Sequence, residues 1–324
     1  MEDNRALDDA GGIYLTSSSS MTLRRTEIQR NRANDFAGGI FLIDSSAELH
    51  ESSVSFNKAG KSGGGVSSGK YIGVFDIFAN KRGTSGIRFI ACIIEGNTAE
   101  DDGGGLDLYY DVTLDLVNTL VRDNTAGAAG SGGGLRIRGK VTLNAENSTI
   151  SSNYAASGGG LAAADNCIVE MCNVSFELNL AQSDEGGIYS QSTSFSLSRC
   201  RIGPQNTAED GGGAYITQES SLELKEGSLV YGNSGSNGGG AHVSVDSHLI
   251  VRDSSFEDNY ASSRGETLQC VAVCCSILQC VTFVLQASSK GETSSLLVSF
   301  FLSHLLFVAH SHTLALTHMH IFAL

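Results

Sequence analysis

Acidic side chains are the groups in this sequence whose type and spacing could do chemistry. They stand just before short runs of glycine, as Asp8, Asp9 and Asp35 do near the start of the chain. Six further along are candidate Ca²⁺ ligands: Asp101, Asp102, Asp184, Glu185, Glu209 and Asp210. Carboxylate oxygens suit Ca²⁺, and paired carboxylates can also hydrolyse glycosides. Other glycine runs lack a preceding acid, so we expect solvated turn residues, with calcium sites as the alternative.

Basic side chains gather most densely at Arg136, Arg138 and Lys140, which we interpret as the basic face of a strand. Residues 71–86 interrupt the regular pattern described below, and long loops are where repetitive folds carry their sites. This insertion contains Asp76, Lys81 and Arg82. It is the candidate for a catalytic loop, but the sequence assigns no catalytic residue.

A repeated asparagine organises these groups. Asn followed two residues later by Ala recurs every 26 to 29 residues, except for one interval of 40 between Asn57 and Asn97 that the insertion explains. A pair or triplet of glycines follows all but the last asparagine. After Asn4, the predicted column comprises Asn31, Asn57, Asn97, Asn124, Asn153, Asn179, Asn206, Asn233 (with Gly in place of Ala) and Asn259.

Apolar and polar residues alternate in short runs within each repeat. Between residues 160 and 179 they predict three strands, at 161–163, 167–171 and 174–176. Glycine runs in every unit exclude a helical repeat. The sequence therefore predicts an all-β fold, a right-handed parallel β-helix of about nine coils that stack about 4.8 Å apart into a rod of roughly 40 Å. We expect the asparagine to adopt left-handed geometry at a corner and to bond its neighbours as a column.

The motifs resemble the pectin-lyase-like right-handed β-helix superfamily, and most closely the chlamydial polymorphic outer-membrane protein repeats. Those repeats pair a Gly-Gly-Ala-Ile-like motif with Phe-x-x-Asn. The first motif is matched at residues 11–13, 38–40, 186–188 and 212–214, and the second at 176–179 and 256–259. The resemblance implies a secreted or surface passenger domain, often adhesive. The superfamily also contains polysaccharide lyases and hydrolases. The Arg-Ile-Arg sequence at Arg136 resembles the Arg-Ile-Lys element of polygalacturonases, but the Gly-Asp-Asp and His-Gly motifs that accompany it in those enzymes are absent here.

The repeat domain spans residues 1–265, and residues 266–324 form a Cys- and His-rich apolar tail of another kind. Residues 293–324 contain no Asp, Glu, Lys or Arg but five His. A membrane segment, a His-rich metal site and translated non-coding sequence are three open explanations, and we favour the last, with a disordered or spurious tail and no metal. Because the repeat is already in progress at Asn4, we expect natural sequence upstream, including any signal peptide.

A net charge of −14 disfavours nucleic acid and anionic membranes as partners. A membrane partner would require the 293–324 tail to be a real anchor. The sequons at Asn147 and Asn173 would carry glycans if the chain is secreted. We expect the four repeat-region cysteines, Cys92, Cys167, Cys172 and Cys200, to be small buried groups.

The regularity of the repeat favours a binding or structural protein over an enzyme, because catalysis usually needs local irregularity. We therefore expect a secreted or cell-surface structural or adhesive β-helix that binds glycans or proteins without catalysis. The alternative is a polysaccharide lyase or glycoside hydrolase. No cofactor is expected, and Ca²⁺ remains an alternative.

Overall fold

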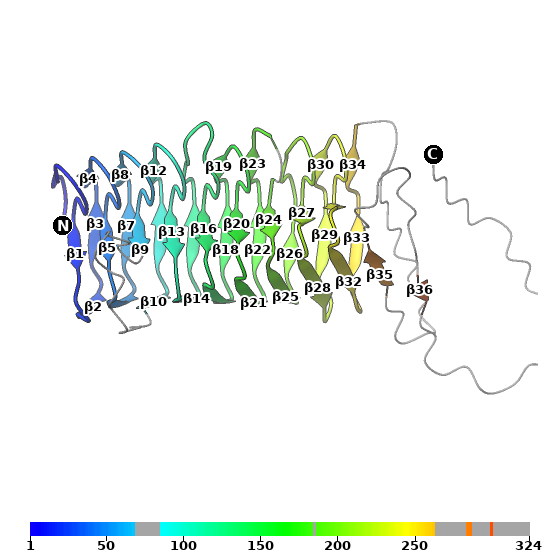
Figure 1. The fold of residues 1–324 in the computed structure, drawn as a ribbon, viewed down its shortest axis with the longest axis horizontal. Coiled ribbons are helices and arrows are strands. Elements are labelled where there is room, and N and C mark those ends of the chain that lie inside the picture. Colours follow the sequence, from blue (N-terminus) through cyan, green and yellow to red (C-terminus); the bar gives the residue numbers. More distant parts are fainter. Residues whose placement is uncertain (69–84, 184–185, 263–282, 287–298, 301–324) are drawn as a thin grey trace, which may run out of the picture.

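The computed structural model describes residues 1–68, 85–183, 186–262, 283–286 and 299–300. These residues form a parallel β-solenoid and contain no helix. Two sheets have nine strands each, one strand per coil, and Figure 1 shows the coils stacked in sequence order from blue to yellow. The predicted all-β fold of about nine stacked coils is confirmed.

Each coil contributes one strand to each of three long parallel sheets. Sheet 1 contains β1 (Ile13–Leu15), β5 (Ile40–Leu42), β9 (Val66–Ser68), β13 (Leu106–Tyr109), β16 (Leu135–Arg138), β20 (Leu161–Ala164), β24 (Ile188–Gln191), β27 (Ala214–Thr217) and β31 (Ala241–Val243). Sheet 2 contains β2 (Ser20–Arg24), β6 (Ser46–His50), β10 (Ser85–Ile90), β14 (Val112–Val117), β17 (Thr142–Glu146), β21 (Ile168–Cys172), β25 (Ser194–Ser198), β28 (Ser221–Lys225), β32 (His248–Val251), β35 (Phe283–Gln286) and β36 (Ser299–Phe300). Sheet 3 contains β3 (Glu27–Gln29), β7 (Ser53–Ser55), β11 (Ile93–Glu95), β15 (Leu120–Arg122), β18 (Thr149–Ser151), β22 (Ser175–Glu177), β26 (Arg201–Ile202), β29 (Leu229–Tyr231) and β33 (Ser255–Glu257).

A fourth, two-residue strand follows the asparagine in many coils, which the three-strand prediction missed. Two residues are too short for an alternation pattern to be visible in sequence. These strands are β4 (Arg32–Ala33), β8 (Lys58–Ala59), β12 (Thr98–Ala99), β19 (Tyr154–Ala155), β23 (Leu180–Ala181), β30 (Ser234–Gly235) and β34 (Tyr260–Ala261).

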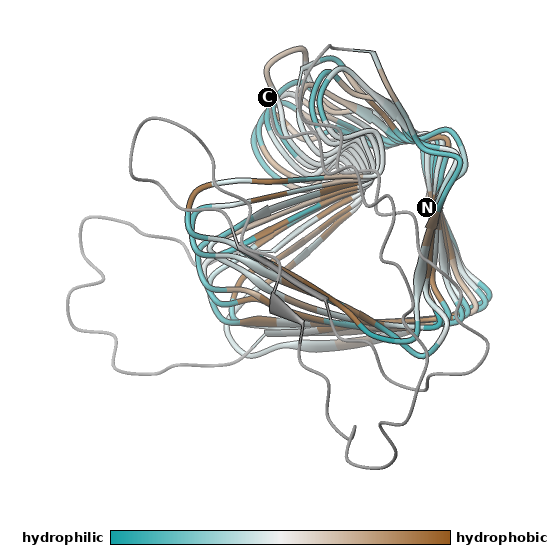
Figure 2. Cartoon of the chain, turned by 90° about the vertical axis from the view of Figure 1, so that its right-hand side faces the viewer, coloured by the Kyte–Doolittle hydropathy of each residue, from teal (hydrophilic) through white to brown (hydrophobic). Residues whose placement is uncertain are grey.

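The core lies inside the three sheets, as the view along the solenoid axis shows (Figure 2). Inward residues stack on their counterparts in the next coil: Ile87, Leu114, Leu143 and Val169 are paired in register and almost fully buried. Outward residues on the same strands alternate with them and are more exposed. Burial of apolar surface along the whole axis therefore stabilises the stack, and each coil depends on its neighbours.

Asparagines form a continuous hydrogen-bonded column from Asn4 to Asn259, and those from Asn31 to Asn233 are buried. The amide Nδ2 of each donates to the Oδ1 of the next, as from Asn97 to Asn124 and from Asn124 to Asn153, both at 3.0 Å. The backbone N–H of Asn97 also donates to Asn124 Oδ1 at 3.0 Å, and Asn124 Nδ2 also donates to the carbonyl of Ile94 at 3.0 Å. Asn124 is fully buried and out of reach of water, so these hydrogen bonds are what satisfy its polar atoms.

The expected left-handed geometry falls one residue earlier than predicted. The column asparagines are absent from the positive-φ residues of the described chain, whereas the residue before each has a positive φ, for example 54° at Asp123 and 55° at Ser152. The asparagine needs an extended backbone to aim its amide along the axis. The residue before the asparagine adopts the left-handed conformation instead, and its amino-acid type differs from coil to coil.

Glycine runs follow the column asparagines in the sequence because the last glycine of a run packs directly against this column. A Cβ at Gly134 would lie 2.6 Å from the carbonyl oxygen of Gly160 and 3.0 Å from the side chain of Asn153. The first glycine of a triplet has another role: Gly132 has a φ of 70°. The glycine runs thus supply both a left-handed turn and the space that the asparagine amide occupies.

The other two corners carry shorter columns of Ser, Thr and Cys. Between sheets 1 and 2, the N–H of Thr193 donates to Ser220 Oγ at 3.1 Å. Between sheets 2 and 3, the N–H of Thr119 donates to Ser148 Oγ at 3.0 Å, and that of Cys200 to Ser228 Oγ at 3.1 Å. Each corner of the solenoid therefore has side-chain acceptors for backbone groups that the sheets leave unpaired.

The remaining predictions on domain limits fall largely outside the described residues. Of the insertion at 71–86, only residues 85 and 86 are described, and they belong to β10. Most of the tail at 266–324 is likewise outside them, apart from β35, which pairs with β32 in antiparallel fashion, and β36. The domain boundary at residue 265 stays a prediction.

Replacing a central column residue should be far more costly than replacing a surface asparagine. We expect Asn124→Ala to lower the free energy of unfolding by about 3 kcal/mol, because it strands buried polar groups of Asn97 and Ile94. Asn144→Ala, which removes one bond to Asp115 on a partly exposed face, should cost less than about 1 kcal/mol. Urea unfolding of both variants measures the difference, and equal costs would contradict the structural role of the column.

Candidate functional site

Four of the six predicted calcium ligands, Asp101, Asp102, Glu209 and Asp210, are among the described residues. Asp101 and Glu209 are exposed, while Asp184 and Glu185 lie outside the described residues. Asp102 is paired with Arg136 and accepts the Ser131 N–H at 2.8 Å. Asp210 accepts from Asn237 Nδ2 at 2.6 Å. Asp102 and Asp210 therefore already bond groups of neighbouring coils. A calcium site at these six residues stays a prediction.

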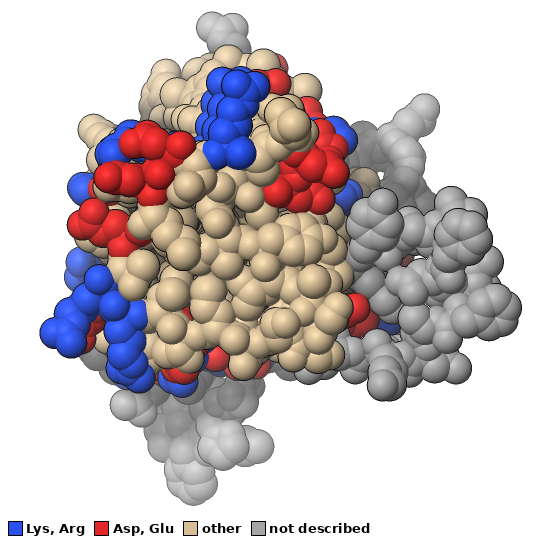
Figure 3. Space-filling model, turned by 90° about the vertical axis from the view of Figure 1, so that its left-hand side faces the viewer, with Lys and Arg blue, Asp and Glu red and all other residues tan. Residues whose placement is uncertain are grey.

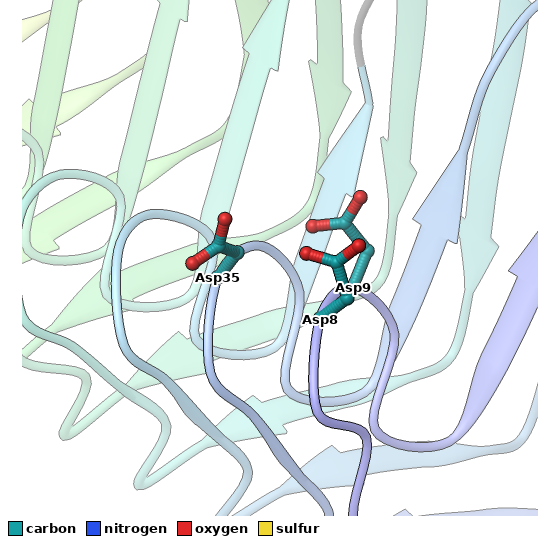
Figure 4. A group of neighbouring side chains, drawn as sticks. All are labelled: Asp8, Asp9 and Asp35. Carbon is teal, nitrogen blue, oxygen red and sulfur yellow. The ribbon is translucent and has the colours of Figure 1, made fainter.

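A different set of acids does converge. Asp8, Asp9 and Asp35 each place a carboxylate oxygen within 4.8 Å of the others, and Figure 4 shows the three carboxylates on adjoining turns. Burial and the neighbouring Asp8 and Asp35 raise the pKa of Asp9, opposed by its bond from the Phe36 N–H. Lys61 Nζ lies 2.6 Å from Asp35 Oδ2. This acidic group could offer ligands to Ca²⁺, but the Lys61 amine already neutralises one of them.

Arg136 lies at the centre of a largely buried ionic network. Its guanidinium contacts Asp102 and, at 3.4 Å, Asp107 Oδ1 on the adjacent strand. Asp107 is 1% exposed, and burial raises its pKa to about 6, although Arg136 opposes the shift. Arg136 of β16 is therefore paired with two carboxylates and does not stand alone on the predicted basic face. The sequence by itself did not indicate those pairings.

The partner of Arg138 is aromatic. Its guanidinium carbon lies 5.4 Å from the ring centre of Tyr109, in register on the next strand. Burial, and then the charge of Asp107, raise the pKa of Tyr109 to about 12. Tyr109 therefore stays a neutral phenol at physiological pH and is unsuited to accept a proton in catalysis.

A shallow depression lies on the outer face of sheet 2. Two hollows of about 550 and 390 Å³ share Arg88 and Asp115, so together they extend over strands from β2 to β28. Polar and apolar surface both line them, and the lining includes small hydroxyl residues such as Ser20, Ser46 and Ser196. The outward position of successive strands holds, in register, Glu48, Arg88, Asp115, Asn144, Glu170, Ser196 and Glu223.

Ion pairs and a hydrogen bond hold one part of this row. Arg88 lies 3.8 Å from Glu48 and 4.0 Å from Asp115, and Asn144 Nδ2 donates to Asp115 Oδ1 at 2.9 Å. Arg88 remains 52% exposed at its side chain. Because the row holds more carboxylates than cations, it offers donors and acceptors to an outside ligand and carries a net negative charge. Aligning the repeats at this strand position would have revealed it in the sequence.

Charged side chains also lie around the N-terminal end of the solenoid. In Figure 3 the acidic and basic side chains surround the end of the solenoid, and the middle of that end carries neither. Arg30, for example, pairs with Glu2 at 2.6 Å and Asp3 at 3.1 Å. These pairs join neighbouring coils at exposed positions and contribute little stability each.

The sequons and three of the repeat-region cysteines, Cys92, Cys167 and Cys200, occupy corner positions, whereas Cys172 ends β21. Asn147 and Asn173 are exposed and follow β17 and β21, with Asn173 Nδ2 donating to Asn147 Oδ1 at 2.8 Å. Cys167 and Cys200 are buried, and desolvation raises the pKa of each to about 11. Cys172 was wrongly expected to be buried: it is partly exposed and accepts from Arg199 Nη2 at 2.8 Å.

No family model, curated protein or solved structure matches the chain. In the part of the chain that the structure describes, no helix is long and apolar enough to cross a membrane. The described residues form a parallel β-solenoid with a depression of mixed polar and apolar lining along one sheet.

Acidic pH should stabilise this protein through Asp107. A folded-state pKa of about 6 lies above the ordinary value of 3.8, so the folded state binds this proton more tightly. The contribution of Asp107 to unfolding free energy should fall by about 2 kcal/mol as pH rises from about 4 to about 6, and then stay level. Asp107→Asn should remove that slope in urea unfolding at pH 4 to 7. A slope unchanged in the variant would contradict this assignment.

Thiol accessibility should separate the four repeat-region cysteines. We expect iodoacetamide to modify Cys172 in the native protein and to leave Cys92, Cys167 and Cys200 unmodified, because burial raises the pKa values of those three thiols. Peptide mapping by mass spectrometry reads each site separately. Cys172→Ser is the matched control, and native-state labelling of Cys167 or Cys200 would contradict their placement.

Proposed function

We propose that this chain is a secreted or cell-surface structural or adhesive rod that binds glycans or proteins without catalysis. The ligand surface in this proposal is the outer face of sheet 2. Membership of the pectin-lyase-like superfamily, close to the chlamydial polymorphic outer-membrane protein repeats, is part of the same proposal and rests on the motifs alone. The proposal needs no cofactor, and Ca²⁺ remains a candidate ligand of the acidic turns.

The continuous depression along sheet 2 carries this proposal. It runs parallel to the solenoid axis, crosses β2 to β28, and presents charged, amide and hydroxyl groups together with apolar surface from residues such as Met21 and Ala47. An extended polymer fits such a surface better than a compact small molecule, because compact ligands bind in concave, mostly apolar sites. The excess of carboxylates over Arg88 disfavours an anionic polymer and leaves acceptors for a ligand rich in hydroxyl or amide groups.

The chemistry of the carboxylates favours binding over catalysis. Asp107 has the raised pKa of a general acid, yet it is 1% exposed and lies against the Arg136 guanidinium. Asp102 is held by the same guanidinium and by the Ser131 N–H. A catalytic acid must reach the bond that it protonates, and a glycosidic oxygen cannot approach Asp107 in this arrangement.

The alternative function is a polysaccharide lyase or hydrolase, and Arg136 between two carboxylates is the observation in its favour. Incubation with pectin or alginate, followed by absorbance of unsaturated products and by reducing-end assays, tests it. Activity that disappears in Asp101→Asn, Asp102→Asn or Arg136→Ala would establish the enzyme and overturn the non-catalytic proposal. We expect no turnover by the unaltered chain.

Changing the centre of the depression should weaken ligand binding without unfolding the rod. We expect Arg88→Glu combined with Asp115→Lys to weaken binding of the full chain to glycan arrays and to cell surfaces by at least about tenfold. Arg201→Ala, an exposed site on sheet 3, is the control and should bind normally. Unchanged binding by the double variant would contradict the assignment of this face.

A further inference from the structure

A second surface lies on the outside of sheet 1, toward the C-terminal coils. Tyr189 of β24, Tyr215 of β27 and His242 of β31 are paired in register, and each is partly exposed. At the same strand position in earlier coils, Phe41, Ser67, Asp107 and Ala162 are at most 4% exposed, Arg136 is partly exposed, and Tyr14 of β1 is 48% exposed. We call Tyr189, Tyr215 and His242 the aromatic row.

The rings of the row are held by one another. The ring centres of Tyr189 and Tyr215 are 6.2 Å apart with nearly parallel planes, and His242 stands edge-on to Tyr215 at 4.7 Å. Aromatic pairs in these geometries restrict ring rotation. A rigid phenol also supplies amphipathic contact area at a low cost in conformational entropy.

Neutral polar groups line one side of the row. Tyr189 Oη donates to Gln191 Oε1 at 2.9 Å, and Gln191 Nε2 donates to Gln218 Oε1 at 2.7 Å. In the next coils, Ser244 Oγ lies 3.2 Å from Tyr215 Oη and 3.1 Å from Thr217 Oγ1. Each coil therefore presents an aromatic ring beside a hydroxyl or an amide.

A carboxylate adjoins the row at its His242 end. Asp210 Oδ2 lies 3.9 Å from His242 Nδ1, and Asp210 Oδ1 accepts from Asn237 Nδ2 at 2.6 Å. An amide and an imidazole therefore already engage this acid.

We infer that the aromatic row is a binding subsite for a neutral glycan chain lying parallel to the solenoid axis. Coils rise about 4.8 Å, close to the length of one hexose in an extended β-linked chain, so successive rings and polar groups would meet successive sugars. Sugar rings combine apolar C–H surfaces with hydroxyl groups, which match phenol rings flanked by amides and hydroxyls. The inference deepens the proposed glycan-binding function and adds a face distinct from sheet 2.

The chemistry favours this ligand over an anion or a peptide. No residue of the row, or of its neighbours Gln191, Thr217 and Ser244, is Lys or Arg, so an anionic polymer would find no positive partner there. An apolar peptide side chain usually anchors in a buried pocket, whereas this surface consists of rings edged by hydrogen-bonding groups.

Glycan-array binding by the full chain, followed by calorimetry with β-1,4- and β-1,3-linked glucan hexamers, tests the inference. We expect neutral β-linked glycans to bind, and Tyr189→Ala and Tyr215→Ala each to weaken that binding by about tenfold. Tyr215→Phe keeps the ring and should retain most of the affinity. Tyr14→Ala, at the same strand position at the far end of sheet 1, should bind normally.

The outcomes separate this inference from the proposed function. No binding of neutral glycans by the unaltered chain, or normal binding by Tyr215→Ala, would overturn the aromatic row as a glycan site. If the sheet 2 double variant loses binding while the tyrosine variants keep it, the sheet 2 proposal stands and this inference fails. Loss of binding in the tyrosine variants alone would support this inference and contradict the sheet 2 proposal. Circular dichroism checks that each variant is folded, and a peptide library that binds in place of glycans would also overturn the inference.

Discussion

The buried asparagine column is the interaction on which the rest of the structure depends. Each amide bonds the amide and the backbone N–H of adjoining coils, in a space that only glycine leaves open, as Gly134 does against Asn153. The two residue types are therefore required together. If a larger residue replaced the glycine, its Cβ would collide with the asparagine side chain. If the asparagine were replaced, the buried backbone groups that it bonds would be left unpaired.

This constraint leaves the outward positions free to vary. Because the column and the apolar core set the position of every coil, a side chain such as Arg88 or Tyr215 contributes little to stacking and can differ from coil to coil. Equivalent outward residues nevertheless fall in rows along the axis. A solenoid therefore converts a sequence repeat into linear surfaces, which suit polymeric ligands. The two surfaces proposed for binding are both rows of this kind.

Much of the fold could be predicted from the sequence, because asparagine, glycine and apolar residues recur in phase. The site could be predicted less well. Asp102 is paired with Arg136, which lies 34 positions later, and no local pattern in the sequence indicates that pairing. The acidic group of Asp8, Asp9 and Asp35 depends on how turns of adjacent coils approach. The left-handed residue before each asparagine also escaped prediction, because backbone geometry alone defines it.

Native-state hydrogen exchange, resolved by peptide and read by mass spectrometry, tests the central role of the column most directly. The account predicts that the backbone amides of Asn97 and Asn124, which donate to the next asparagine, exchange among the slowest in the chain. It also predicts faster exchange at Asn4 and Asn233, toward the ends of the column. Exchange at the central asparagines as fast as at exposed turn residues would contradict the account.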